Sequence, residues 1–143
     1  STTLSREFTQ LRAYLDIMSV RMGPRLIYRL ELPADLEQTS IPPMLLQPLV
    51  ENAIRHGIEP KVGSGTIEVA ACRTPTGIAI EVTDSGIGLP PDDEPPQSSD
   101  GTSGSYGLLH VRERLAVIYG GRASLVLSRR ASSGVSAVVS IPA

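Results

Sequence analysis

The chain has 143 residues, a net charge of −2 and a hydrophobic share of 41%, which is ordinary for one soluble globular domain. Aromatic residues make up only 3%, so the core must be aliphatic, and recognition of nucleic acid by base stacking is disfavoured. The slight negative charge also argues against a nucleic-acid partner. Cys72 is the one cysteine, which excludes a disulfide framework and a cysteine-based metal site.

The cellular location of the protein is predicted from its hydropathy and its first residues. No apolar run reaches the roughly 20 residues of a membrane span, and the chain begins without Met on a stretch typical of the middle of a helix. We therefore expect a cytoplasmic domain cut from a longer protein, whose parent is anchored in the cell membrane.

The first predicted element is an amphipathic helix over residues 4–20, where apolar side chains recur every three or four positions. These positions are Leu4, Phe8, Leu11, Leu15 and Met18. Ser5 is the predicted N-cap, and the Gly-Pro pair at 23–24 predicts the end of the helix. Outside a helix bundle, the apolar stripe is expected to be an exposed, adhesive surface.

A strand is predicted over 27–32, followed by a polar connector over 33–40. The next helix is predicted to begin at the Pro-Pro pair 42–43 and to end at Gly57, a plausible C-cap. Its apolar stripe consists of Leu45, Leu46, Leu49, Val50, Ala53 and Ile54. Pro48 lies inside this run and is expected to kink the helix or lengthen its first turn, because one backbone bond is lost.

The second half of the chain predicts two hairpins separated by a long loop and a helix. The elements are strands 65–73 and 77–83, a loop over 85–106, a helix over 108–119, and strands 123–129 and 135–141. A loop of this length inside a compact domain is generally functional or disordered. The order of elements predicts an α+β fold, a two-layer sandwich in which helices cover one face of a mostly antiparallel sheet.

Polar residues gather on one flank of the apolar helix that precedes Gly57. Asn52 lies in mid-helix although Asn is a poor helix former, and Glu51, Arg55 and His56 accompany it. A solvated helix face is the simplest interpretation of this group. A second motif later in the chain favours a binding site.

That motif is Asp84, which ends an alternating strand and is followed at once by Gly86 and Gly88. A turn after a strand would explain the pattern. Alternatively, the strand end presents a carboxylate, and the glycines let a ligand approach the backbone closely. An ionised carboxylate only accepts hydrogen bonds, so it suits an exocyclic amine such as that of adenine.

Both motifs, in this order, resemble the N box and first glycine box of the GHKL ATPase superfamily. Further segments are similar to the LytS-type sensor histidine kinases, and the resemblance runs from about residue 11 to residue 142. The segments are YLDI, IPPMLLQPLVENAIRHG, DSGIGLP, YGLLHVRERLAVIYGG and SGVSAVVSIP. The resemblance implies the Bergerat-type ATP-binding fold with ATP and Mg²⁺ as cofactors.

The resemblance also implies a role for each motif residue. Asn52 would be the metal ligand and, with Glu51, a catalytic residue, although Gln47 is an equal candidate for the base. Arg55 would contact phosphate, and His56 would lie near the nucleotide. Asp84 would accept the hydrogen bond from the adenine amino group. Gly86 and Gly88 would shape its pocket.

A second glycine box is implied by Gly104, Tyr106, Gly107 and Leu108, at the start of the helix over 108–119. Its N-terminal amides would face the phosphates, and the preceding loop would be a lid over ATP. The sequence departs from the family at Ser105 and His110, where Gly and Asn are usual. It also departs at Val135, where the family has a Thr hydroxyl and Ser136 is the nearest substitute.

As a whole, the resemblance predicts the catalytic part of a histidine kinase. Residues 1–22 would be the C-terminal part of the dimerisation helix with its connector, and 23–143 the ATP-binding catalytic domain. The γ-phosphate would pass to a His on an upstream helix outside this chain, and then to a response regulator, within a homodimer. Two alternatives remain: a GHKL-type ATPase or protein-serine kinase, and a degenerate nucleotide-binding docking domain.

Overall fold

The computed structural model describes residues 1–59, 63–86, 103–130 and 134–142, with only the backbone of 103–107. Its centre is a five-stranded sheet in the order β2-β4-β5-β7-β6. β2 runs parallel to β4, and every other pair is antiparallel. The strands are β2 (Leu26–Glu31), β4 (Gly65–Thr74), β5 (Gly77–Asp84), β6 (Ser124–Arg129) and β7 (Val135–Pro142).

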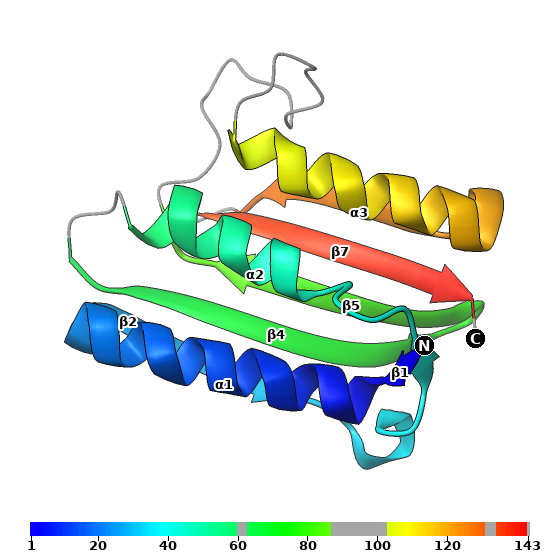
Figure 1. The fold of residues 1–143 in the computed structure, drawn as a ribbon, viewed down its shortest axis with the longest axis horizontal. Coiled ribbons are helices and arrows are strands. Elements are labelled where there is room, and N and C mark those ends of the chain that lie inside the picture. The colour runs from blue at the N-terminus through cyan, green and yellow to red at the C-terminus, as the bar shows by residue number, and fades with distance from the viewer. Residues whose placement is uncertain (60–62, 87–102, 131–133, 143) are drawn as a thin grey trace.

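Three longer helices lie across one face of this sheet in the order α1, α2, α3 (Figure 1). They are α1 (Leu4–Met22), α2 (Gln47–Ala53), which continues as the π-helical segment η3 (Ile54–Ile58), and α3 (Ser103–Tyr119). Short 3-10 turns occur at η1 (Gly23–Arg25), η2 (Ala34–Leu36) and η4 (Gly120–Arg122), and β1 (Thr2–Thr3) pairs with β3 (Ser40–Ile41). The predicted two-layer sandwich with a mostly antiparallel sheet is confirmed.

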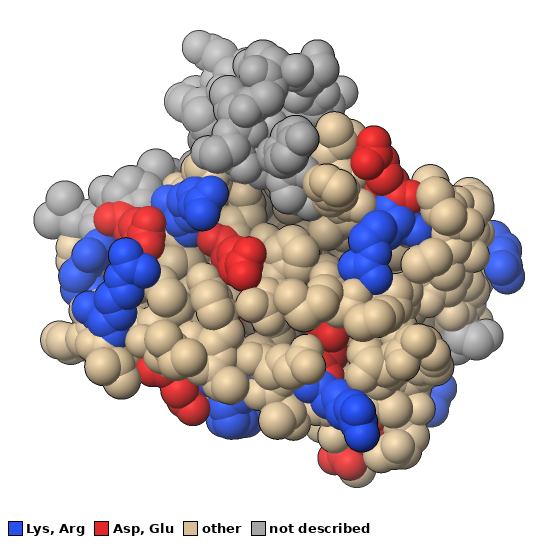
Figure 2. All heavy atoms as spheres, viewed as in Figure 1, with Lys and Arg blue, Asp and Glu red and all other residues tan. Residues whose placement is uncertain are grey.

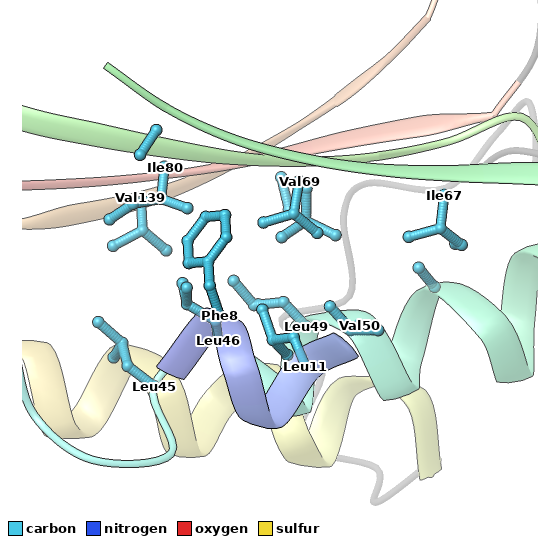
Figure 3. Packing of buried hydrophobic residues seen from close by; sticks show 14 of the residues in the cluster. Phe8, Leu11, Leu45, Leu46, Leu49, Val50, Ile67, Val69, Ile80 and Val139 are labelled. Carbon is cyan, nitrogen blue, oxygen red and sulfur yellow. The ribbon is translucent and has the colours of Figure 1, made fainter. Parts of the chain in front are cut away.

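The core lies between the sheet and the helices, and it is aliphatic as the composition predicts. Figure 3 shows Phe8 and Leu11 of α1 and Leu49 of α2 pointing toward Val69 of β4 and Val139 of β7. The alternation of β4 and β5 follows from this burial, because every second residue faces the helices.

α1 belongs to this core. All five residues of its predicted apolar stripe are buried, and Leu4, Leu11 and Leu15 have no exposed surface. The expectation that the stripe is an exposed surface is therefore wrong, since the sheet of the same chain covers it. The N-cap is Thr3, whose Oγ1 accepts from the Arg6 N–H at 3.2 Å, and not Ser5. A continuation of α1 into a dimerisation helix stays a prediction about the longer protein.

The helix that carries Asn52 differs from its prediction at both ends. α2 begins at Gln47, not at the Pro-Pro pair, so Pro48 falls in its first turn, where a missing N–H costs no helical bond. The predicted kink or extended turn at Pro48 is therefore absent. Gly57 is not a C-cap, because it lies inside the π-helical segment. The C-cap is Glu59, whose backbone keeps the right-handed helical conformation.

The helix α3 begins at Ser103, five residues before the predicted start at 108. The loop predicted over 85–106 is correspondingly shorter. Residues 87–102, which would form the lid, lie outside the described part of the chain. The hairpin turn at 74–77 is as predicted, since Thr74 pairs with Gly77, while residues 131–133 of the second turn are not described.

The face that carries the helices has a mixed surface. Figure 2 shows Lys and Arg side chains interspersed with Asp and Glu, with neutral surface between them.

The burial of α1 leads to a stability prediction. Leu11→Ala removes a side chain with no exposed surface and should lower the free energy of unfolding by about 3 kcal/mol. Val20→Ala, on the same helix but with an 87% exposed side chain, should change it by less than about 0.5 kcal/mol. Urea unfolding of both variants measures the difference. Equal, small effects would mean that α1 does not pack on the sheet.

Candidate functional site

The polar flank of the predicted site lies on the continuous helix α2–η3. Glu51, Arg55 and His56 are exposed, while Asn52 is half-buried at the border between the polar flank and the core. Glu51 accepts a hydrogen bond from the side-chain amide of Gln47 at 3.1 Å, one helical turn away. The two predicted candidates for a base therefore contact each other.

The carboxylate of Asp84 lies at the end of β5 and is 5% exposed. It points to the helix-covered face, because Ile80 and Val82 of the same strand alternate onto that face. Its Oδ1 accepts the Gly86 N–H at 2.8 Å. The strand end thus presents a buried acceptor whose orientation is fixed by the backbone that follows it.

Ser85 ties this strand end to β4. Its N–H donates to the carbonyl of Thr66 at 3.0 Å, and its Oγ accepts the Thr66 N–H at 2.8 Å. Two hydrogen bonds to Thr66 therefore fix the residue that follows Asp84.

Three glycines converge on Asp84 from three parts of the chain. A Cβ added to Gly57 of η3 would lie 2.7 Å from Asp84 Oδ1, and one on Gly86 would lie 2.3 Å from the Gly57 carbonyl oxygen. Gly134 adopts a left-handed φ of +93°, and a Cβ there would lie 1.9 Å from the Asp84 carbonyl oxygen. The backbone thus forms a close cradle around one carboxylate, which brings the two predicted motifs together.

Asn52 lies close to this cradle along its helix. It precedes Gly57 by five residues on the same continuous helix. The site therefore combines a buried acceptor at the strand end with an amide further along the helix.

Sequence reasoning missed two contributors to the cradle. Gly57 contacts Asp84 across 27 residues, and its sequence neighbours indicate only a helix end. Arg130 donates from Nη1 to the Asp84 carbonyl at 3.1 Å, and its N–H donates to the Gly134 carbonyl at 3.1 Å. No sequence pattern at Arg130 indicates this, because the contact depends on β6 and β5 both lying beside β7.

Ser136, the nearest substitute for the missing Thr hydroxyl, points to the wrong face of the sheet. Ser136 pairs with Thr83 and donates its hydroxyl to Glu81, on the face of the sheet away from the helices. Val135 alternates with Ser136 and so faces the Asp84 side. A hydroxyl at Ser136 therefore cannot reach a ligand held by Asp84.

The charge state of the helix flank follows from its surroundings. Partial desolvation of the ring, and then the neighbouring Arg55 cation, lower the pKa of His56 from 6.5, while Glu59 opposes them. Burial, and then Glu51 and Glu59, raise the pKa of Tyr14 on the adjacent α1. At pH 7 His56 is therefore mostly neutral, and Arg55 is the cation of this flank.

The remaining predicted residues belong to the second glycine box and its approach. Gly104, Tyr106 and Gly107 lie in the first turns of α3, whose side chains there are not described, and Gly88 lies outside the described residues. Leu108 is 1% exposed and packs in the core. The helix α3 lies beside α2, and any contact of these residues with a ligand stays a prediction.

Metal binding at this site would depend on few protein ligands. Among the described residues, no three His, Cys, Asp or Glu side chains are grouped to hold an ion. Asn52 offers one half-buried amide oxygen. Mg²⁺ commonly takes one or two protein oxygens and completes its shell with water and substrate phosphates, so the residues present fit that mode of binding.

The backbone cradle predicts a sharp response to one methyl group. Gly86→Ala should displace η3 from the end of β5, because its Cβ would lie 2.3 Å from backbone atoms of Gly57 that cannot rotate away. We expect a loss of about 2 kcal/mol in stability and large amide shifts at residues 56–58 in NMR spectra. Gly121→Ala is the control, because its Cβ would meet nothing within 4 Å. Equal behaviour of the two variants would contradict the close approach.

Comparisons with known proteins assign the chain to a family. The family model described as "Histidine kinase-, DNA gyrase B-, and HSP90-like ATPase" matches residues 42–143. The sensor protein LytS of Bacillus subtilis is 32% identical over 97% of this chain and 24% of its own length. The sensor histidine kinase YpdA of Escherichia coli is 32% identical over 82% of this chain and 21% of its own length. The chain thus spans about a quarter of these relatives.

Solved structures share the fold. The catalytic domain of the histidine kinase ThkA superposes with a TM-score of 0.73 over 98% of this chain and 93% of that domain, at 17% identity. A blue-light activated histidine kinase of Erythrobacter litoralis gives 0.66 over 92% of this chain and 40% of that protein, at 18% identity. With the family model covering both the Asn52 helix and the Asp84 strand end, the chain belongs to the histidine kinase-, DNA gyrase B- and HSP90-like ATPase family.

Proposed function

We propose that this chain is the ATP-binding catalytic domain of a sensor histidine kinase. The observation that carries the proposal is the buried Asp84 carboxylate, which lies beside the helix of Asn52. The surrounding backbone is packed so closely that a Cβ added to its glycines would clash. Membership of the ATPase family and relatives that are named sensor histidine kinases support it. A buried acceptor in such a cradle suits a flat, nitrogen-rich ring.

Adenine recognition would be the task of Asp84. Its carboxylate can only accept, so it selects a ring that offers an N–H₂ group there and rejects one that offers a carbonyl. The Gly86 N–H fixes the carboxylate through Oδ1, which lowers the cost of orienting it when a ligand binds. Gly57 and Gly86 have no side chain, so their backbones pack directly against the Asp84 carboxylate and against each other.

Phosphate and metal binding would fall to the helix flank. When bound, Mg²⁺ would neutralise charge on the phosphate oxygens, and the Asn52 amide oxygen would be its protein ligand. Arg55 supplies a permanent cation on the same flank. His56, mostly neutral at pH 7, would act as a hydrogen-bonding neighbour of the nucleotide. Glu51 and Gln47 both remain candidates for a base.

The phosphate acceptor would lie in the longer protein. We propose a His on an upstream dimerisation helix as acceptor, a response regulator as the next, a homodimeric assembly and a membrane-anchored parent. The relatives named sensor histidine kinases support this over an ATPase, a protein-serine kinase or a docking domain. Among the helices that the structure describes, none has the length and apolar character to cross a bilayer.

Nucleotide titration tests the proposal. Asp84→Asn replaces one acceptor oxygen by a donor and should weaken ATP binding by about tenfold or more, with loss of the preference for ATP over GTP. Asn52→Ala should instead remove most of the gain in affinity that Mg²⁺ confers. Calorimetry with ATP, GTP and metal-free ATP measures both effects.

The control for these variants is Asp35→Asn, which makes the same change of charge in an exposed ion pair with Arg73. It should bind ATP as the unchanged chain does. If Asp84→Asn binds ATP with undiminished affinity and selectivity, the proposed site is wrong.

A further inference from the structure

The helix that carries Asn52 lacks caps of its own. At its start, Leu46 is the N-cap and has no side chain able to bond the free amides, and the first turn holds no acidic residue. At its end, Glu59 continues in right-handed geometry rather than as a glycine cap. Helix ends leave several N–H and C=O groups without helical partners, so those of α2–η3 must find them elsewhere.

The partner at the N-terminal end is Glu7 of α1. Its side chain is 1% exposed, Oε2 accepts the Leu46 N–H at 2.8 Å, and Oε1 accepts the Met44 N–H at 3.2 Å. A glutamate that bonds the N-cap amide is the arrangement of a capping box, here supplied by another helix. Met44, with a left-handed φ of 59°, is held in this geometry.

The partner at the C-terminal end is Arg25, the last residue of η1, the turn that follows α1. Its Nη2 donates to the carbonyls of Ile58 and Glu59 at 3.1 Å each, and its Nε donates to the Gly63 carbonyl at 3.4 Å. A cation at a helix C-terminus and an anion at its N-terminus both match the helix dipole.

We propose that Glu7 and Arg25 are paired positioning residues that set where Asn52 lies relative to the Asp84 cradle. Asn52 is six residues after Leu46 and six before Ile58, so the two contacts hold the helix on either side of it. Both come from one short stretch of chain, α1 with η1. A displacement of α1 therefore acts on both ends of the nucleotide helix. This inference rests on the proposed function.

Single substitutions test the two contacts. Glu7→Gln keeps the size of the side chain but turns an N–H₂ group toward the N–H of Met44 or Leu46, so one of the two hydrogen bonds is lost. The affinity for Mg·ATP should therefore fall about fivefold. Arg25→Gln should have a similar effect, and Arg25→Lys a smaller one, because lysine keeps the charge but loses the planar fork. Glu37→Gln and Arg29→Gln, at exposed positions, are the controls and should leave the affinity unchanged.

A second result, measured in chains that lack the Asn52 side chain, separates positioning of Asn52 from a loss of fold stability. In chains that already carry Asn52→Ala, Glu7→Gln and Arg25→Lys should no longer weaken Mg·ATP binding, because the group they position is gone. Their effects on urea unfolding should persist in that background. An equal loss of affinity with and without Asn52, or unchanged affinity in both single variants, overturns the proposal.

The failure of this inference can be told from failure of the function. If Asp84→Asn abolishes ATP binding while Glu7→Gln and Arg25→Lys bind normally, only the positioning role is wrong. If Asp84→Asn binds normally, the proposed function is wrong and the positioning role with it. Should Glu7→Gln fail to fold, Arg25→Lys alone decides, since it replaces one half-buried cation by another.

Discussion

Asp84 lies where three stretches of backbone converge, and a side chain at Gly57, Gly86 or Gly134 would occupy space that is already filled. This close approach determines how the sheet and the helix layer meet at the site. It requires α2 to continue through a π-helical segment that brings Gly57 against the carboxylate. It also requires the β6–β7 hairpin to reach Asp84, where Arg130 bonds its carbonyl. The nucleotide site proposed above is a consequence of this packing.

The two-layer fold could be predicted because local patterns and burial agree along most of the chain. Alternation in β4 and β5 and the three-to-four spacing in α1 both match the faces that are buried. The ends of helices were harder to predict. Pro48 suggests an interruption unless the helix is known to begin at Gln47. Ser5 competes with Thr3 as the N-cap because it lies only two residues later. Which residue begins or caps a helix depends on tertiary contacts. Their contribution of about 1 kcal/mol is comparable with that of the local capping preferences.

The site was predictable as motifs but not as a geometry. Asn52 stands out because Asn is a poor helix former, and Asp84 because Gly86 and Gly88 follow it at once. The contacts of Gly57 and Arg130 with Asp84 join residues far apart in sequence, and nothing local indicates them. Ser136 shows the opposite failure: proximity in sequence suggested a role that the alternation of β7 directs to the other face of the sheet.

α1 changes meaning in the same way. From the sequence, its apolar stripe is expected to be exposed unless partner helices cover it, but the stripe packs on the sheet of its own chain. Once α1 is part of the core, the buried Glu7 has a structural reason, since an unpaired buried carboxylate would be costly. Its two amide partners lie at the start of the helix that carries Asn52. The helix α1 is therefore in direct contact with the helix that carries Asn52.

The central claim is that the Asp84 cradle and the Asn52 helix form one nucleotide site. Its most direct test is an NMR titration of the ¹⁵N-labelled chain with ADP, first without and then with Mg²⁺. The account predicts that ADP alone shifts the backbone amides of Gly57, Gly86 and Gly134 while Gly121 stays unchanged, and that Mg²⁺ then shifts the side-chain amide of Asn52. Saturable shifts that spare all four of the predicted groups, or no binding at millimolar ADP, would contradict it.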